Sequence, residues 1–357
     1  MSSPFGARYV GDMDRMFDTY AELVPLMMDF YRDLHPKQRD DSDFVYRQAI
    51  RAKAFDALRG LLPAASLSNV GIYGSGQAYE ALLLRLRSMA LPEANRYADL
   101  MLTELRKVIP SFLRRVDLAD RGVAWSNYLS DNRRAMEAIT ERILGEDGHG
   151  AESATDSESS VTLVDFDPEG EIKVVAAMLY PYSHESELQV EARVREMTVA
   201  ERIGVMKAYV GDRANRRHKP GRALERTFYH FDVLGDYGAF RDLQRHRMMT
   251  VEWQALTPLH GYVMPEAIEA AGATQSFEDT MQRSRELYED LVGPFPAQAA
   301  YAVSLAYRIR YSMRLNAIGD APPRTAIQPT GPSLLSDRRP ADARATRRGR
   351  RAPRSQR

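Results

Sequence analysis

The sequence predicts an α+β fold that is mostly helical, with a small sheet confined to the second half of the chain. Apolar residues recur at helical spacing through most of the patterned segments. Only residues 161–166 (VTLVDF) and 227–233 (TFYHFDV) show the β-branched and aromatic alternation that is typical of strands. An acidic stretch, residues 146–160, separates a helical first block from the second block that contains both strands.

The first block, residues 1–145, is predicted to be helical throughout its patterned part. Four segments carry apolar residues at i, i+3, i+4 and i+7, namely 17–35, 42–63, 76–89 and 93–116. Ser42 or Asp43 is placed to cap the second segment, and Pro63 is placed to end it. Four amphipathic faces can bury one another, so a bundle-like core is expected in this block.

Two segments lack the apolar residues that a core requires. Residues 146–160 are rich in Gly, Ser, Asp and Glu, which predicts an acidic flexible linker. Residues 318–357 are rich in Arg, Pro and Ala, which predicts a disordered basic tail. Two readings of this tail stay open. The first is a native arm that makes weak contact with a polyanion. The second is a frame-shifted coding end that interrupts a patterned segment.

The second block, residues 161–317, begins with the first strand, a Pro-Glu-Gly turn and a helix. A second helix is expected at 199–210, and the second strand follows it. Residues 236–249 are then predicted as a helix that carries Arg245, His246 and Arg247 on its last turn. The pattern predicts another helix at 276–293 and a last helical segment at 299–317.

Composition narrows the class of protein. The chain has 357 residues, is 44% hydrophobic and has a formal net charge of zero. No apolar run approaches the roughly 18 residues of a membrane span, and Met1 to Phe5 do not resemble a secretory signal, so a cytoplasmic protein without a membrane partner is expected. The absence of cysteine excludes disulfides, thiolate catalysis and zinc-thiolate sites. The histidines lack the spacing of a metal site, so none is expected.

The basic triplet Arg245, His246 and Arg247 is the main candidate for a binding site. Two guanidinium groups beside an imidazole offer hydrogen-bond donors that suit a phosphate or a carboxylate. The competing interpretation is a solvated basic face of a helix. The sequence has neither a GxGxxG motif nor a Walker lysine that would hold a phosphate in another way.

The order of a strand, a Leu-Glu pair and a helix that ends in Arg-His-Arg resembles the flavin-dependent thymidylate synthase family. In that family the triplet is followed by seven residues and then by a serine. Here the Leu-Glu pair is Leu224 and Glu225, and Arg226 stands where the family has histidine. The serine position is Ala255, and Thr257 stands where an arginine usually follows. The match to the signature is therefore partial.

A second resemblance lies in the first block. Residues 75–87 (SGQAYEALLLRLR) resemble the C-terminal helices of the family, with Arg87 at the position of the last arginine. Asn316 and Ala317 resemble the start of the same stretch at the end of the second block. Together these likenesses suggest a tandem, two-domain member of the family that is truncated and partly degenerate.

The resemblance implies a function and a set of residues. Family members reduce FAD with NADPH and transfer a methylene group from methylenetetrahydrofolate to dUMP, which gives dTMP without a cysteine nucleophile. They act as homo-oligomers, so dUMP, folate and further copies of the chain are the implied partners. The resemblance implies cofactor binding by Arg245, His246, Arg247 and Glu225, and substrate binding by Arg87 and Gln254. It identifies no catalytic residue. The alternative is a catalytically degenerate relative that keeps the fold for binding or assembly.

Overall fold

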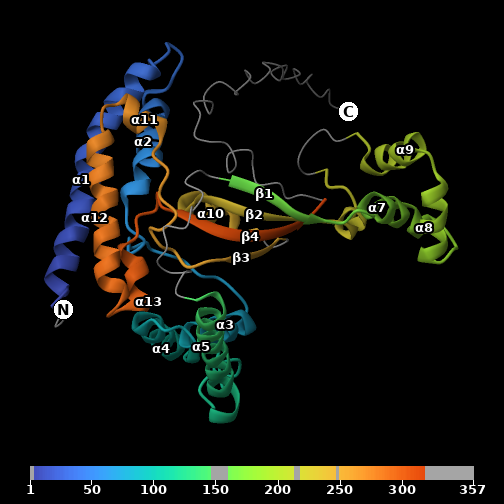
Figure 1. The fold of residues 1–357 in the computed structure, drawn as a ribbon, viewed down its shortest axis with the longest axis horizontal. Coiled ribbons are helices and arrows are strands. Elements are labelled where there is room, and N and C mark those ends of the chain that lie inside the picture. Colours follow the sequence, from blue (N-terminus) through green and yellow to red (C-terminus); the bar gives the residue numbers. More distant parts are fainter. Residues whose placement is uncertain (1–3, 146–159, 213–217, 247–248, 318–357) are drawn as a thin grey trace, which may run out of the picture.

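The computed structural model describes residues 4–145, 160–212, 218–246 and 249–317. In these ranges the α+β prediction is confirmed, because helices surround one antiparallel sheet with the strand order β1-β2-β4-β3 (Figure 1). A layer of long helices stands at one end of the sheet, α3, α4 and α5 lie below it, and α7, α8 and α9 lie at its other end. The predicted linker and basic tail fall outside the described residues, apart from Ser160, and the division into two blocks stays a prediction.

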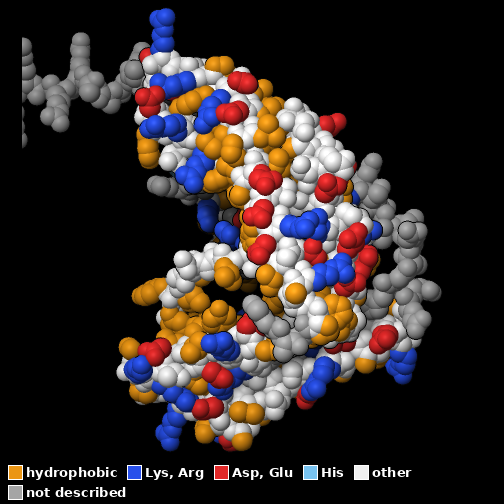
Figure 2. Space-filling model, turned by 90° about the vertical axis from the view of Figure 1, so that its left-hand side faces the viewer, with side chains coloured by type: hydrophobic (Ala, Val, Ile, Leu, Met, Phe, Trp, Pro, Cys, Tyr) orange, Lys and Arg blue, Asp and Glu red, His pale blue; other side chains and the backbone are white. Residues whose placement is uncertain are grey.

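The long helices form a layer whose core joins both blocks of the chain. The long helices are α1 (Gly6–Leu34), α2 (Asp43–Leu58) and α12 (Thr274–Val292). The layer also contains the short helices η1 (Arg59–Leu61), α11 (Glu266–Ala270), α13 (Pro296–Ala299) and η5 (Ala300–Ala302). Met27, Leu58, Phe277 and Tyr307 are almost fully buried in one shared cluster. Figure 2 shows acidic and basic side chains interspersed over the outer face, and a hollow between this layer and the helices below.

The second group of helices has a core of its own. It consists of α3 (Gly76–Arg87), α4 (Pro92–Arg106), η2 (Ala119–Val123) and α5 (Ala124–Leu144). Leu83, Ala98 and Leu113 are completely buried in its cluster. The bundle-like core expected for the first block is therefore wrong. The first predicted helix packs against α12 and the second packs against α1 and α11, whereas the other two pack against each other.

The third group is stabilised by its helix starts as well as by its core. It contains α7 (Gly170–Leu179), η3 (Tyr180–Tyr182), α8 (Glu187–Glu196), α9 (Val199–Val210) and η4 (Arg222–Arg226). Ser186 with Gln189, and Thr198 with Glu201, form capping boxes that satisfy backbone N–H groups at the starts of α8 and α9. In the described ranges, no helix is both long enough and apolar enough to cross a bilayer.

The sheet consists of β1 (Ser160–Phe166), β2 (Phe228–Asp236), β3 (Thr250–Trp253) and β4 (Arg308–Asn316). Both predicted strands are present, and all four strands lie in the second block as expected. The helical prediction for 299–317 is wrong from residue 303 onwards, and residues 308–316 form a strand. Ile309, Tyr311 and Met313 are buried at every second position, and this period of two fits a strand that is buried on one face.

The helix before the basic triplet is shorter than predicted. In α10 (Tyr237–Leu243) the Asp236 side chain accepts a hydrogen bond from the N–H of Ala239, and the helix ends at Leu243. The triplet therefore lies beyond the helix and not on its last turn, which corrects the sequence-based expectation. The N–H groups of Arg245 and His246 bond to carbonyls three residues earlier, in a tighter turn. Arg247 is outside the described residues.

One face of the sheet is buried against α10. Phe240 has no exposed surface, and its ring centre lies 4.7 Å from that of Tyr311 and 5.6 Å from that of Trp253. Val233 and Ile309 complete the contact from the two central strands. This packing leaves the opposite face of the sheet free for polar side chains.

We expect Phe240→Ala to lower the free energy of unfolding by about 3–5 kcal/mol, because the substitution leaves a cavity between α10 and the sheet. Phe44→Ala is the matched control, since Phe44 is 66% exposed, and it should change the value by less than about 0.5 kcal/mol. Urea unfolding followed by circular dichroism measures both. Equal losses in the two variants would contradict the proposed packing of α10.

Candidate functional site

The polar face of the sheet is the candidate functional site. Strand β4 is central, and its residues alternate between the buried face and the polar face. The polar positions of β4 are Arg308, Arg310, Ser312 and Arg314. Ser312 and Arg314 have partners on both β2 and β3, whereas Arg308 and Arg310 pair with β2 alone.

The strand pairing arranges these neighbours in rows across the sheet. The central row contains Asp232 of β2, Ser312 of β4 and Glu252 of β3, which are direct partners in the two ladders. The next row contains His230, Arg314 and Thr250. Side chains of directly paired residues lie on the same face of a sheet, so the central row places a hydroxyl between two carboxylates.

Short contacts order part of this face. His230 Nε2 and Ser312 Oγ lie 2.7 Å apart and share a hydrogen bond. Arg310 Nε lies 3.7 Å from Asp232 Oδ2, and both side chains are about one-third exposed. The guanidinium carbon of Arg314 lies 3.7 Å above the centre of the Phe228 ring, a cation–π contact. In the described part of the chain, no such partner is found for the carboxylate of Glu252.

A hollow of about 250 Å³ opens at this place. Its lining residues are Asp232, Glu252, Trp253, Gln254, Arg310, Tyr311 and Ser312. The N–H of Gln254 donates to the carbonyl of Arg310 (3.0 Å), which extends the β3–β4 ladder by one bond. The hollow is smaller than the roughly 300–1,000 Å³ of typical ligand pockets, so it fits part of a nucleotide and not the whole of it.

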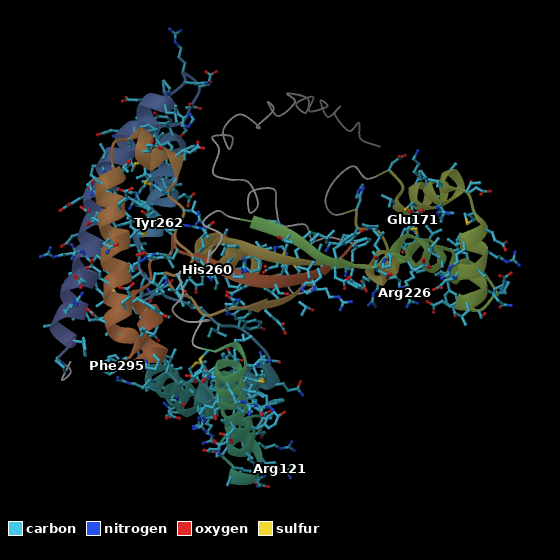
Figure 3. All side chains as sticks on the ribbon, in the orientation of Figure 1. Arg121, Glu171, Arg226, His260, Tyr262 and Phe295 are labelled. Carbon is cyan, nitrogen blue, oxygen red and sulfur yellow. The ribbon has the colours of Figure 1, made fainter. Side chains whose placement is uncertain are left out.

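His260 lies where the helical layer meets the sheet, close to Tyr262 (Figure 3). Its carbonyl accepts a hydrogen bond from Arg308 Nη1 (3.2 Å). Burial lowers the pKa of the His260 imidazole below its ordinary value, and the positive charges of Arg310 and Arg308 lower it further. The imidazole therefore stays neutral over a wider pH range than that of a free histidine.

The structure separates the residues that the sequence suggested for binding. Gln254 lines the hollow, whereas Arg87 ends α3 and bonds to Asp99 Oδ1 (2.6 Å) in the lower helical group. Arg245 is 76% exposed, and its Nη2 lies 3.4 Å from Asp242 Oδ1. Its place just after the C-terminus of α10 also suits a cation, because the helix dipole is negative there.

Glu225 belongs to a separate ion pair. Its carboxylate accepts hydrogen bonds from Arg222, with Nη2 at 2.9 Å, and this interaction lowers the pKa of Glu225. Arg226, at the histidine position of the family signature, pairs with Glu187 of α8 (2.8 Å). The carbonyl of Leu224 accepts the N–H of Ala317 (3.1 Å), so this segment lies at the end of β4 near Arg314.

Sequence reasoning missed most of the polar face. The sequence analysis does not identify Glu252, Ser312 or Arg310 as site residues. The available signal was the strict alternation of polar and apolar residues in RIRYSMR (308–314). Among the described residues, no three His, Asp or Glu side chains are grouped to hold a metal ion.

The sheet with its polar face defines an α+β domain that presents cations, carboxylates and amides beside a shallow hollow. Residues 162–318, which include β2, β3 and β4, match the family described as "Thymidylate synthase complementing protein" (Thy1). This match agrees with the resemblance to the flavin-dependent thymidylate synthases that the sequence of this segment shows.

Comparisons with individual proteins extend beyond this segment. A UPF0159 protein of Chlamydia pneumoniae is 38% identical over 322 residues, and one of Chlamydia muridarum is 35% identical over 320 residues. Each alignment covers 89% of this chain and 59% of the relative, so the chain spans about three-fifths of their length. A UMP/dUMP methylase, PolB from Streptomyces cacaoi bound with 5-Br dUMP, aligns at 15% identity with a TM-score of 0.33, over 45% of this chain and 74% of that one.

The lowered pKa of His260 predicts a dependence of stability on pH. An unfolded histidine takes up a proton near its ordinary pKa of 6.5, before the folded His260 does, so the free energy of unfolding should fall as the pH falls from about 7 to 5. His35, whose pKa is also lowered, contributes in the same direction. His260→Gln should show a smaller fall, measured by urea unfolding at the two pH values. Parallel falls in the parent and the variant would contradict the assignment.

Proposed function

We propose that the polar sheet face binds a pyrimidine nucleotide and that the protein methylates dUMP to dTMP. In this proposal methylenetetrahydrofolate is the one-carbon donor and NADPH the reductant. The observation that carries it is the set of cations and hydrogen-bonding groups along β3 and β4, inside the segment that matches the Thy1 family. The partial signature in residues 245–254 supports this proposal.

The nucleotide phosphate would bind to arginines of β4. Arg310 and Arg314 project from the same face on either side of Ser312, and guanidinium forks donate two hydrogen bonds to a phosphate. Arg310 is held against the sheet by Asp232, which orients it and limits its loss of side-chain entropy on binding. Gln254 would contact the nucleotide from the end of β3.

FAD is the proposed cofactor, and it would supply the redox chemistry when bound. The donors of Arg245 and His246 fit a flavin phosphate, since Arg245 is largely exposed and lies close to the start of β3. Glu225, which already orients Arg222 just before the start of β2, would contact the cofactor from there. The hollow on the sheet is lined by other residues, so the flavin phosphate would bind outside it.

A second copy of the chain would complete the site. The hollow is shallow, and a nucleotide with a flavin needs a larger enclosing surface than the described residues provide there. We therefore propose a homo-oligomer in which another subunit closes the open side, with folate bound at the same interface. In an active enzyme this closure would also exclude water from the reacting atoms.

A second candidate function follows from one departure from the signature. Ala255 replaces the signature serine and offers no hydroxyl, and it directly follows Gln254 at the hollow. A protein that binds the nucleotide without turning it over would keep the polar face and lose this group. Ala255→Ser addresses this alternative, because restored turnover in the variant identifies the missing hydroxyl as the limiting group.

We expect Arg310→Ala to weaken dUMP binding about tenfold or more, because a hydrogen bond between charged groups contributes roughly 1.5–3 kcal/mol. Arg134→Ala is the matched control, since Arg134 lies on the exposed surface of α5 and is 74% exposed. Calorimetric titration with dUMP measures both affinities, and flavin absorbance of the purified protein tests cofactor binding. Equal affinities in the two variants would exclude Arg310 from the nucleotide site.

A further inference from the structure

We propose that α5 is a dimerisation helix that packs antiparallel against α5 of a second copy of the chain. The proposal rests on the homo-oligomer of the proposed function only for the presence of that second copy. It assigns the contact between copies to residues 131–144, which lie outside the segment that matches the Thy1 family.

Helix α5 buries very little of its own surface. Of its 21 residues only Ser126 is buried, and the Ser126 hydroxyl donates to the carbonyl of Leu84 in α3 (3.1 Å). Arg133 also reaches α3, because its Nη1 donates to the carbonyl of Ser88 (3.1 Å). All residues from 131 to 144 are exposed. Helix α5 is therefore attached to α3 along one side only.

Another side of α5 carries a continuous apolar stripe. About 3.6 residues complete one turn, so residues spaced by three, four or seven lie on the same side of the helix. Tyr128 is 60% exposed, Met136 62% and Ile143 67%. Such a stripe is typical of a helix that packs against another element, because exposed apolar surface is unfavourable in water. The stripe consists of Trp125, Tyr128, Leu129, Ala135, Met136, Ile139 and Ile143.

The remaining sides of α5 are polar. Ser126 and Arg133 lie on the side toward α3. Arg134, Glu137 and Glu141 are exposed and lie on the side opposite the stripe. A partner that covers the stripe therefore leaves these charges in water and avoids the cost of burying them.

The charges at the edge of the stripe favour a second α5 as the element that covers it. Asp131 and Arg142 are separated by about three helical turns, so they border the stripe on the same edge. In an antiparallel pair of identical helices about a two-fold axis, this edge of one helix faces the same edge of the other. Arg142 then lies opposite Asp131 of the partner subunit, and the symmetry forms this ion pair twice. The surface is complementary to itself in charge as well as in its apolar stripe.

The length of the exposed part determines the register of the pair. If residues 131–144 of both copies overlap completely, Met136 packs against Ile139 of the partner subunit, and Asn132 lies beside Ile143 of the partner subunit. Asn132, the polar residue within the stripe, is then at the end of the overlap, where water can reach its amide. The contact is about 20 Å long and 10 Å wide, which is small beside the roughly 1,200–2,000 Å² of a stable interface. The dimer should therefore be reversible, with a population that rises with protein concentration.

Sedimentation equilibrium of the full chain at increasing concentration tests the contact. The mass of the parent should rise from that of one copy towards that of two. Met136→Glu should remove this rise, because it places a charge inside the apolar contact. Leu188→Glu is the matched control, since Leu188 is 78% exposed on α8, and it should leave the rise unchanged. Circular dichroism of each variant shows whether the fold is retained.

Charge reversal and crosslinking test the antiparallel register. Arg142→Asp and Asp131→Arg should each weaken the dimer about fivefold or more, because like charges then face each other, and the double variant should recover the parent affinity. The chain has no cysteine, so introduced thiols give unambiguous crosslinks. The combined Asn132→Cys and Ile143→Cys variant should form a disulfide-linked dimer, whereas neither single variant should, since each position meets the other one across the pair.

The possible outcomes separate this proposal from the homo-oligomer on which it rests. An unchanged rise in mass in the folded Met136→Glu variant overturns the role of α5 and leaves the homo-oligomer intact. Crosslinking of either single cysteine variant overturns the antiparallel register. A parent that stays monomeric at every concentration overturns the homo-oligomer, and the proposal with it.

Discussion

The segment from Val303 to Asn316 holds the helical layer and the sheet together. Its first part runs beside residues 60–64, where the N–H of Leu305 donates to Leu62 (2.9 Å) and that of Ala306 donates to Gly60 (3.0 Å). A side chain at Gly60 would place its Cβ 2.9 Å from that of Ala306. The two chain segments therefore approach so closely that only glycine fits at this position. Without a break, the segment then becomes the central strand of the sheet.

Tyr307 anchors the point at which this segment changes its role. Its hydroxyl donates to the carbonyl of Met281 in α12 (2.7 Å), and burial raises its pKa to about 12, so it stays a donor at all ordinary pH values. The next residue begins β4. The position of Tyr307 in the helical core therefore decides which residues of β4 face α10 and which face the hollow. A shift of β4 by one residue would exchange the two faces and dismantle the polar rows.

The sequence predicted those parts of the structure that depend on local patterns. The long helices and the strands at 161–166 and 227–233 carry clear periodicities, and the structure contains them. The sequence predicts a helix in place of strand β4, because this segment continues from an alanine-rich stretch and because its end resembles the start of a family helix. The site was harder to predict, since the row of Asp232, Ser312 and Glu252 exists only through the pairing of three strands that are distant in the chain. Gln254 was found through the family signature, whereas no local pattern links the other three.

The late place of β4 in the chain has a consequence for biosynthesis. The hydrogen bond from Ser304 to Leu61 spans 243 residues, and β4 pairs with β2 across about 80 residues. Contacts between such distant residues slow folding, because much chain entropy is lost before they form. During translation the helical layer and the sheet both lack their common strand until β4 has left the ribosome. Until then, the apolar residues of α12 and β2 stay uncovered, and a nascent chain in this state is a natural client for chaperones.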